Sequence, residues 1–321
     1  MRSQLKKWVS AIAVAVPFLV ATSTSVNAAD WKPPGPVKLM IAFAAGGGAD
    51  TQARLIAEEI EASTGWKFIP ENVTGKGGVN LLNAMKGMPN DGTVIGMVVT
   101  ETLGYNRVAA KGSGLELSDF TALTTTAGSQ MGIVAKTDSG MTSFDDVVAA
   151  AKGGKEIRFG VMSPRLGDIA YLLGQAHDIE FNLVSLKGGK AVMNALNAGD
   201  IDIGWGAGIQ TKAVVAGDMV NLVSGIPKPL DASPDAPLIK DLGVDYDAGA
   251  YFMLIAPGGM EEDVRNALAK ELAAVAENPD SKAGGLIKKA FGGAMIIQGA
   301  ELDARLAAES EGAAALMKAS E

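Results

Sequence analysis

The sequence predicts an α/β protein with a mainly parallel sheet, and two observations carry this prediction. Short apolar runs of strand length alternate with segments of helical apolar spacing along most of the 321 residues. The composition, with 40 glycines and only 5% aromatic residues, suits repeated strand–turn–helix units. Such alternation is typical of parallel sheets joined by right-handed crossovers, and the length allows one large or two medium domains.

The first strand–turn–helix unit is the most informative. Residues 37–43 form an apolar run, the glycines at 46–48 make a turn, and a helix is expected over residues 51–64. We assign Asp50 as the N-cap of this helix and Gly65 as its stop. Free main-chain N–H groups and the helix dipole suit an anion such as a carboxylate at this turn. The alternative is an ordinary structural turn, and neither a Walker loop nor a dinucleotide fingerprint is present.

The other elements follow in order along the chain. Strands are predicted at residues 67–71, 93–99, 120–125, 131–136, 158–161, 181–185, 201–205 and 251–256. Helices are predicted at residues 79–88, from the capping residue Ser143 to Ala151, at 261–277 and at 301–318.

The N-terminus has the three parts of a secretory signal peptide, assigned to residues 1–28. A basic start is followed by the apolar run 8–20 and by small residues at 26–28, where cleavage is expected. The apolar run is too short to span a membrane. We therefore expect an exported chain.

Charge and cysteine content exclude several kinds of function. The net charge is −8, and removal of the three basic residues of the signal peptide lowers it to −11. An acidic chain without a basic cluster is a poor binder of nucleic acid. The absence of cysteine excludes disulfides, thiol chemistry and cysteine-ligated metals. The chain also offers no cofactor or metal motif.

Four motifs in order resemble the solute-binding proteins of tripartite tricarboxylate transporters, the Bug or TctC family. They are FAAGGGAD at 43–50 with Arg54, ENVTGKGG at 71–78, PNDGT at 89–93, and LKGG at 186–189 followed by AGDID at 198–202. Each motif alone is weak, whereas four in this order are specific. The resemblance covers essentially the whole mature chain.

The resemblance implies a two-lobed periplasmic-binding-protein fold of type II-like form, with two α/β domains joined by two crossing strands. Domain one would comprise residues 30–127 and 252–321, and domain two residues 128–251. The crossings would lie near residues 129–135 and 250–256. A ligand would bind between the two domains when they close.

The implied task is capture of a small organic carboxylate, with a di- or tricarboxylate expected, in the periplasm. A monomeric protein would deliver it to the permease subunits of a tripartite transporter. The matching loops imply ligand contacts from Ala45, Gly46, Gly47, Gly48, Thr74, Gly75, Gly77, Gly78, Thr100 and Glu101 in domain one, and from Ser163, Pro164, Arg165, Lys187, Gly188, Gly189, Trp205, Gly206 and Ala207 in domain two.

Two departures from the family pattern bear on the ligand. The loop at 162–168 lacks the family's hydroxyl-rich form and contains Arg165, which either grips a second carboxylate or pairs with Asp168 at the surface. Leu186 stands where the family has tyrosine. Trp205 either stacks on a flat ligand or packs in a core.

Two other functions stay open at this point. A periplasmic sensor that feeds a sensor kinase would use the same ligand-driven closure. An exported enzyme is the weaker alternative, because His177 is the only histidine and no Gly-x-Ser-x-Gly elbow is present.

Overall fold

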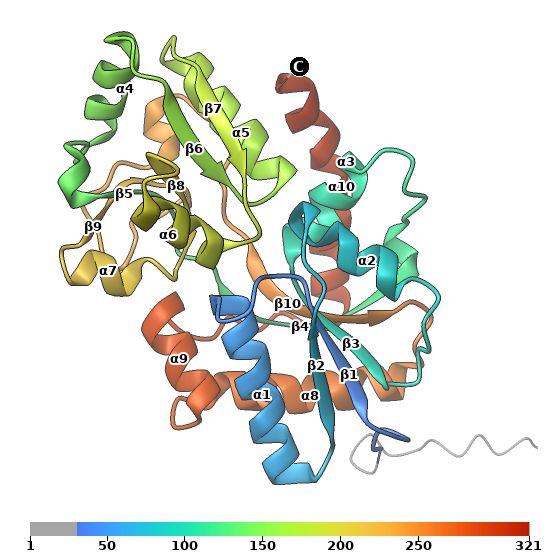
Figure 1. The fold of residues 1–321 in the computed structure, drawn as a ribbon. Coiled ribbons are helices and arrows are strands. Elements are labelled where there is room, and N and C mark those ends of the chain that lie inside the picture. Colours follow the sequence, from blue (N-terminus) through green and yellow to red (C-terminus); the bar gives the residue numbers. More distant parts are fainter. Residues whose placement is uncertain (1–30, 321) are drawn as a thin grey trace, which may run out of the picture.

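The computed structural model describes residues 31–320 and contains two five-stranded sheets flanked by helices (Figure 1). The expected signal peptide lies outside the described residues. We call the parts built on the two sheets lobe one and lobe two. Lobe one has the strand order β2-β1-β3-β10-β4, with β1 (Val37–Ile41), β2 (Phe68–Asn72), β3 (Val94–Val99), β4 (Phe120–Gly128) and β10 (Tyr251–Pro257). Lobe two has the order β7-β6-β8-β5-β9, with β5 (Met131–Lys136), β6 (Ile157–Val161), β7 (Phe181–Ser185), β8 (Ile203–Ala207) and β9 (Met219–Ser224).

Both sheets are mixed, which corrects the prediction of a mainly parallel sheet. In lobe one β2, β1 and β3 are parallel, whereas β10 is antiparallel to β3 and β4. In lobe two β7, β6 and β8 are parallel, whereas β5 is antiparallel to β8 and β9. The reason is topological. We call the region where the chain passes between the lobes the waist. Strands β5 and β10 each follow such a crossing, so they run away from the waist, whereas the strands beside them run toward it.

The helices cover both sheets (Figure 1). The longer ones are α1 (Gly48–Thr64), α2 (Val79–Met85), α4 (Phe144–Lys152), α5 (Pro164–Ala176), α6 (Gly189–Ala198), α8 (Glu262–Glu277), α9 (Lys282–Phe291) and α10 (Gly299–Ala319). Short helical turns are η1 (Lys76–Gly78), η2 (Thr102–Asn106), α3 (Arg107–Ala109), η3 (Leu117–Asp119), η4 (Thr137–Ser139), α7 (Thr211–Val215) and η5 (Ile239–Leu242).

Local signals identified most of the long elements but missed several others, including α9 and β9. The predicted cap Ser143 accepts a hydrogen bond from the N–H of Asp146, and Gly65 ends α1 in the left-handed conformation, so both predictions are confirmed. Helix α9 was not predicted, because a Gly-Gly pair near its start lowers helix propensity. Strand β9 was also not predicted.

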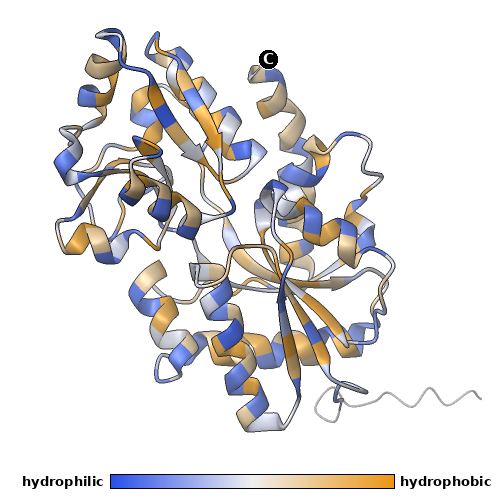
Figure 2. Ribbon diagram, in the orientation of Figure 1, coloured by the Kyte–Doolittle hydropathy of each residue, from blue (hydrophilic) through white to orange (hydrophobic). Residues whose placement is uncertain are grey.

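Buried apolar side chains fill the space between sheets and helices. In the hydropathy colouring of Figure 2, many strand residues are apolar. Lobe one has a core on each face of its sheet. The main core of lobe two also contains Ala313 and Leu316 from α10. Helix α10 therefore runs from lobe one to pack on lobe two, although the expected boundaries assign it wholly to domain one.

The chain crosses the waist where β4 leads into β5 and again where it returns into β10. The distribution of strands between the sheets supports the expected boundaries of 30–127 with 252–321 and of 128–251, which stay a prediction. Gly128 ends β4 and Met131 begins β5, so the first crossing is only two residues long. Such a short connection suits a hinge between two rigid bodies.

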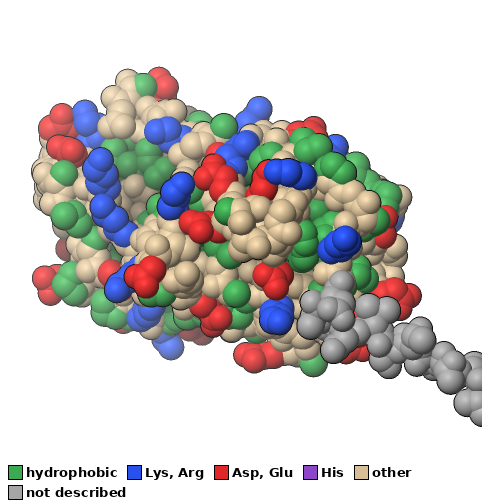
Figure 3. Space-filling model, turned by 90° about the horizontal axis from the view of Figure 1, so that it is seen from below, with side chains coloured by type: hydrophobic (Ala, Val, Ile, Leu, Met, Phe, Trp, Pro, Cys, Tyr) green, Lys and Arg blue, Asp and Glu red, His purple; other side chains and the backbone are tan. Residues whose placement is uncertain are grey.

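The surface seen from below carries basic and acidic side chains interspersed with apolar ones (Figure 3). Within residues 31–320, none of the helices combines the length and the apolar character needed to cross a bilayer.

Candidate ligand-binding site

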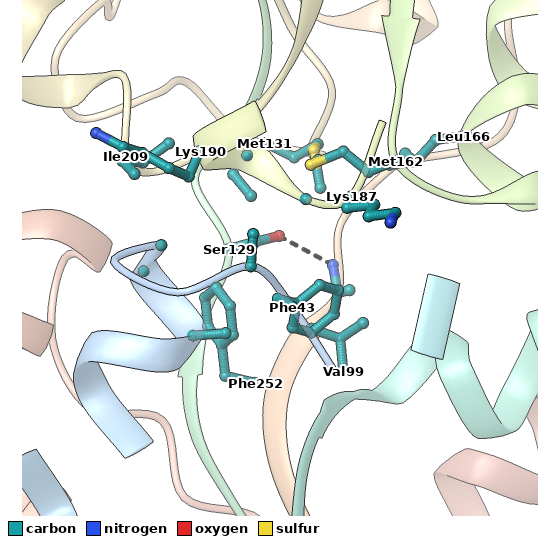
Figure 4. Close-up of a pocket in the computed structure, with 18 of the residues that line it drawn as sticks. Phe43, Val99, Ser129, Met131, Met162, Leu166, Lys187, Lys190, Ile209 and Phe252 are labelled. Atoms are coloured by element: carbon teal, nitrogen blue, oxygen red, sulfur yellow. Dashed lines mark hydrogen bonds between the residues drawn. The ribbon is translucent and has the colours of Figure 1, made fainter. Parts of the chain in front are cut away.

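A cavity of about 60 Å3 lies between the lobes (Figure 4). By size it has room for about four to six water molecules. Its walls are largely apolar, and Figure 4 shows side chains of lobe one facing those of lobe two across it. The lining residues are Phe43, Ala44, Gly47, Gly48, Ala49, Val99, Glu101, Ser129, Met131, Met162, Leu166, Lys187, Gly188, Gly189, Lys190, Ala207, Ile209, Ala250 and Phe252.

The first polar feature of the cavity is the N-terminus of α1. Gly47 is the N-cap residue in an extended conformation and, as a glycine, has no side chain that could cap the helix. The N–H groups of Gly48, Ala49 and Asp50 have no hydrogen-bond acceptor within residues 31–320. Gly48 and Ala49 line the cavity, so the positive end of the helix dipole faces it. Free amides at a helix N-terminus are suited to bind an anion.

Asp50 is not the N-cap, and this prediction was wrong. The helix begins at Gly48, three residues before the predicted start, and Gly47 is its N-cap. The Asp50 carboxylate instead accepts hydrogen bonds from Gly46 N (2.8 Å), Arg54 Nε (2.9 Å) and Asn72 Nδ2 (2.8 Å). Burial raises its pKa, but the hydrogen bonds from Asn72, Gly46 and Arg54 outweigh burial and leave the pKa below the ordinary value. Asp50 thus stays charged and braces the glycine turn.

The second polar feature is the N-terminus of α6 in lobe two. Gly188 caps this helix with a φ of 100°, a conformation that favours glycine. The N–H groups of Gly189 and Lys190 have no acceptor in the described part of the chain, and both residues line the cavity. The free amides at the start of α6 therefore face the same cavity as those of α1.

The two helix N-termini meet at one point. A Cβ on Gly47 would lie 3.6 Å from the Cβ of Lys190, and Ala44 N donates to Lys187 O over 3.3 Å. Two helix dipoles from opposite lobes consequently point at the same cavity. The ammonium ends of Lys187 and Lys190 are exposed and point outward on either side (Figure 4).

The structure brings seven of the predicted contact residues into the cavity wall: Gly47, Gly48, Glu101, Lys187, Gly188, Gly189 and Ala207. Ala45 and Gly46 belong to the same glycine turn but lie outside the wall.

The predicted segment with Thr74, Gly75, Gly77 and Gly78 lies outside the cavity wall as well. The carbonyl of Gly77 accepts hydrogen bonds from Thr102 Oγ1 (2.9 Å) and Asn106 Nδ2 (3.1 Å). A Cβ on Gly77 would lie 2.8 Å from the Cβ of Ser163 in lobe two. This segment therefore supports η2 and the contact between the lobes.

Several predicted residues of both lobes have structural partners instead. The Thr100 hydroxyl accepts from Tyr251 N (3.3 Å), and the Ser163 hydroxyl caps α5 by accepting from Leu166 N (3.3 Å). Pro164 occupies the first turn of α5. Gly206 packs against the side chain of Gln210.

Trp205 belongs to the core of lobe two. Its side chain is fully buried, packs on Phe159 and donates Nε1–H to Leu166 O over 3.1 Å. It is not among the residues that line the cavity. Of the two interpretations of Trp205, ligand stacking is therefore wrong and core packing is confirmed.

Arg165 pairs with Glu101 of lobe one and not with Asp168. Its Nη1 lies 3.4 Å from Glu101 Oε2, and its guanidinium also donates to Gly249 O (3.2 Å) and Asp247 O (2.6 Å). Asp168 instead accepts from the hydroxyl of Tyr105. Burial raises the pKa of Asp168, which the hydrogen bond from Tyr105 only partly offsets.

Most residues of the apolar wall were not predicted as ligand contacts. Val99, Met131, Met162, Ile209 and Phe252 stand at strand ends or in loops and looked like ordinary core residues. Two others carried a usable signal: Ser129 and Ala250 begin the two expected crossings. They meet at the waist, where Ala250 N donates to Ser129 Oγ over 3.1 Å (Figure 4).

Two α/β lobes that enclose a ligand-sized cavity at their crossings define a binding protein of the two-domain periplasmic class. The family model described as tripartite tricarboxylate transporter family receptor matches residues 52–291. The chain therefore belongs to this family of receptors.

Solved structures share the fold. The periplasmic binding protein BugD is 22% identical with a TM-score of 0.78, covering 90% of this chain and 98% of its own. The Rhodopseudomonas palustris protein Rpa4515, solved with adipate, is 23% identical with a TM-score of 0.77, covering 91% and 98%. MatC from the same organism, solved with malate, is 18% identical with a TM-score of 0.76, covering 90% and 100%. At these identities the likeness shows the fold.

Proposed function

We propose that this protein captures a small organic carboxylate between its lobes in the periplasm and delivers it to the permease subunits of a tripartite tricarboxylate transporter. One observation carries the proposal: the free amides of α1 and α6 converge from opposite lobes on one cavity. A carboxylate there would accept hydrogen bonds from both lobes at once. Ligand binding would thereby hold the lobes together.

The expected ligand is a di- or tricarboxylate. Relatives of the same fold were solved with malate and adipate. The apolar wall would cover the carbon chain, and the amides would hold one carboxylate end.

Polar contacts join the lobes around this site. Three of them are Ala44 N to Lys187 O, Arg165 to Glu101, and the Tyr105 hydroxyl to Asp168. A fourth runs from Arg165 N to Asn106 Oδ1 (3.4 Å). We infer a hinge motion at the waist that makes and breaks these contacts, and a closed outer surface that the permease recognises. We also expect export through the predicted signal peptide and a monomer in solution.

A thermal-shift panel on the mature chain tests the proposal. Mono-, di- and tricarboxylates, aromatic acids and acidic amino acids are added in turn. A ligand at about 100 times its dissociation constant stabilises the folded state by about 2.7 kcal/mol, so one class should raise Tm clearly. If no carboxylate raises Tm, the proposal is wrong.

The Gly47→Val variant locates the site. A Cβ at Gly47 would lie 3.6 Å from the Cβ of Lys190 in lobe two, so the two further methyl groups of valine would occupy the space between α1 and α6. The ligand-induced rise in Tm should disappear. Gly35→Val is the matched control, because a Cβ at Gly35 would meet nothing within 4 Å. If the ligand raised the Tm of Gly47→Val as much as that of the wild type, the carboxylate would not bind at this glycine turn.

A further inference from the structure

The cavity contains a buried negative charge, although it is built to receive an anion. Glu101 follows β3 at its carboxyl end and lines the cavity, and its side chain is only 7% exposed. The other charged side chains of the wall in the described chain are Lys187 and Lys190, and both are exposed. Glu101 is thus the one charged group of this wall that is held away from water.

The hydrogen bonds that Glu101 accepts are weak. Its two contacts, with Arg165 Nη1 and Asn106 Nδ2, are both 3.4 Å long, at the outer limit for a hydrogen bond. Arg165 makes its shorter contacts with the carbonyls of Asp247 and Gly249 instead. A buried carboxylate normally accepts several short hydrogen bonds, so Glu101 has acceptor capacity to spare.

A ligand in the cavity could supply a further, shorter hydrogen bond to Glu101. A second carboxylate placed beside Glu101 would repel it at contact distance in a region with little water. A hydroxyl or ammonium group at the same place would instead donate to it. The nearby Ser129 oxygen already accepts from Ala250 N, which leaves the serine hydroxyl hydrogen free to assist in orienting the ligand.

We propose that Glu101 selects ligands that carry a hydroxyl or ammonium group close to the carboxylate held by the helix amides. The ligand class is a small hydroxy- or amino-carboxylate. Any further carboxylate of the ligand must point away from Glu101. This inference rests on the proposed function, because it takes the anion subsite as given.

Two matched series of ligands test the inference by calorimetry. Succinate, malate and aspartate differ only in the hydrogen, hydroxyl or ammonium group on one carbon atom, and propionate, lactate and alanine repeat the comparison with one carboxylate. In the wild type, the hydroxyl or ammonium member of a series should bind at least tenfold more tightly than the unsubstituted acid. The stronger of the two identifies which donor Glu101 accepts.

Variants at Glu101 supply the second half of the test. Glu101→Gln removes the charge, so aspartate and alanine should lose at least tenfold in affinity while succinate gains. Glu101→Asp keeps the charge, so it should bind all the ligands more weakly but in the same order of affinity. It replaces Glu101→Gln in the test if Glu101→Gln does not fold. Glu301→Gln is the control for the change in net charge, since Glu301 is exposed on α10.

The outcomes separate the inference from the proposed function. Equal affinities within a series in the wild type would overturn the inference, as would an affinity ratio unchanged in Glu101→Gln. With either of these results, the proposed function would still hold if the Gly47→Val variant no longer bound the acids. If none of the six acids binds, the anion subsite is wrong and the inference fails with it.

Discussion

Asp50 is expected to control the shape of the anion site, and Asp50→Asn tests this directly. All three partners of its carboxylate are donors: Gly46 N bonds to Oδ2, while Arg54 Nε and Asn72 Nδ2 bond to Oδ1. An asparagine can place its oxygen toward Arg54 and Asn72 only by turning its amide N–H toward the N–H of Gly46. The hydrogen bond that holds the glycine turn is therefore lost.

The cost follows from this geometry. Loss of one hydrogen bond to a charged group, with the Gly46 donor left facing another donor, is worth about 2–3 kcal/mol. The contribution of Arg54 is small, because its side chain is 37% exposed and its ion pair is screened by solvent. At about 2–4 °C per kcal/mol for a protein of this size, Tm should fall by about 4–12 °C.

The pH dependence gives an independent check of the same prediction. The folded-state pKa of Asp50 lies below its ordinary value of 3.8, so its stabilisation is present above that value. It is lost as the pH falls through the folded-state pKa. The free energies of unfolding of the wild type and Asp50→Asn should thus differ at pH 7 and converge in acid below about pH 4.

Urea unfolding followed by circular dichroism measures these free energies, and the thermal-shift panel measures ligand binding. Asp145→Asn is the matched control, since Asp145 lies exposed in the first turn of α4. The ligand-induced rise in Tm should shrink in Asp50→Asn and not in the control. A free energy of unfolding for Asp50→Asn within about 0.5 kcal/mol of the control would refute the reasoning.

Two further substitutions test the structural roles of residues first taken as ligand contacts. Ser163→Ala removes the cap of α5 and should lower the free energy of unfolding by about 1 kcal/mol, with no change in the affinity for carboxylates by calorimetry; exposed Ser118→Ala is its control. Trp205→Phe leaves a void in the core and Leu166 O without its donor, so the free energy of unfolding should fall by about 2–3 kcal/mol. A selective loss of affinity for aromatic acids in Trp205→Phe would contradict its assignment to the core.

The limits of prediction are clearest at Arg165 and Asp50. The sequence places Arg165 three residues from Asp168, which suggests that the two pair along one helix face. In the fold Asp168 is bonded to Tyr105, and Arg165 reaches Glu101, Asp247 and Gly249, all more than sixty residues away. Asp50 looked like a cap because glycine turns give no sign of where a helix begins.

The sequence by itself determined what depends on neighbours along the chain. The strand–turn–helix unit at 37–64, the stop at Gly65 and the cap at Ser143 all follow from local backbone preferences and hydrogen bonds within a few residues. The ordered motifs also sufficed to indicate the family.

Only the tertiary structure decided which strands run antiparallel, where α10 packs and which side chains wall the cavity. It alone brings Gly47 within reach of Lys190, and Ser129 within reach of Ala250. These contacts join segments more than a hundred residues apart. Such pairings are set by how the two lobes pack against each other, and local sequence preference does not encode that packing.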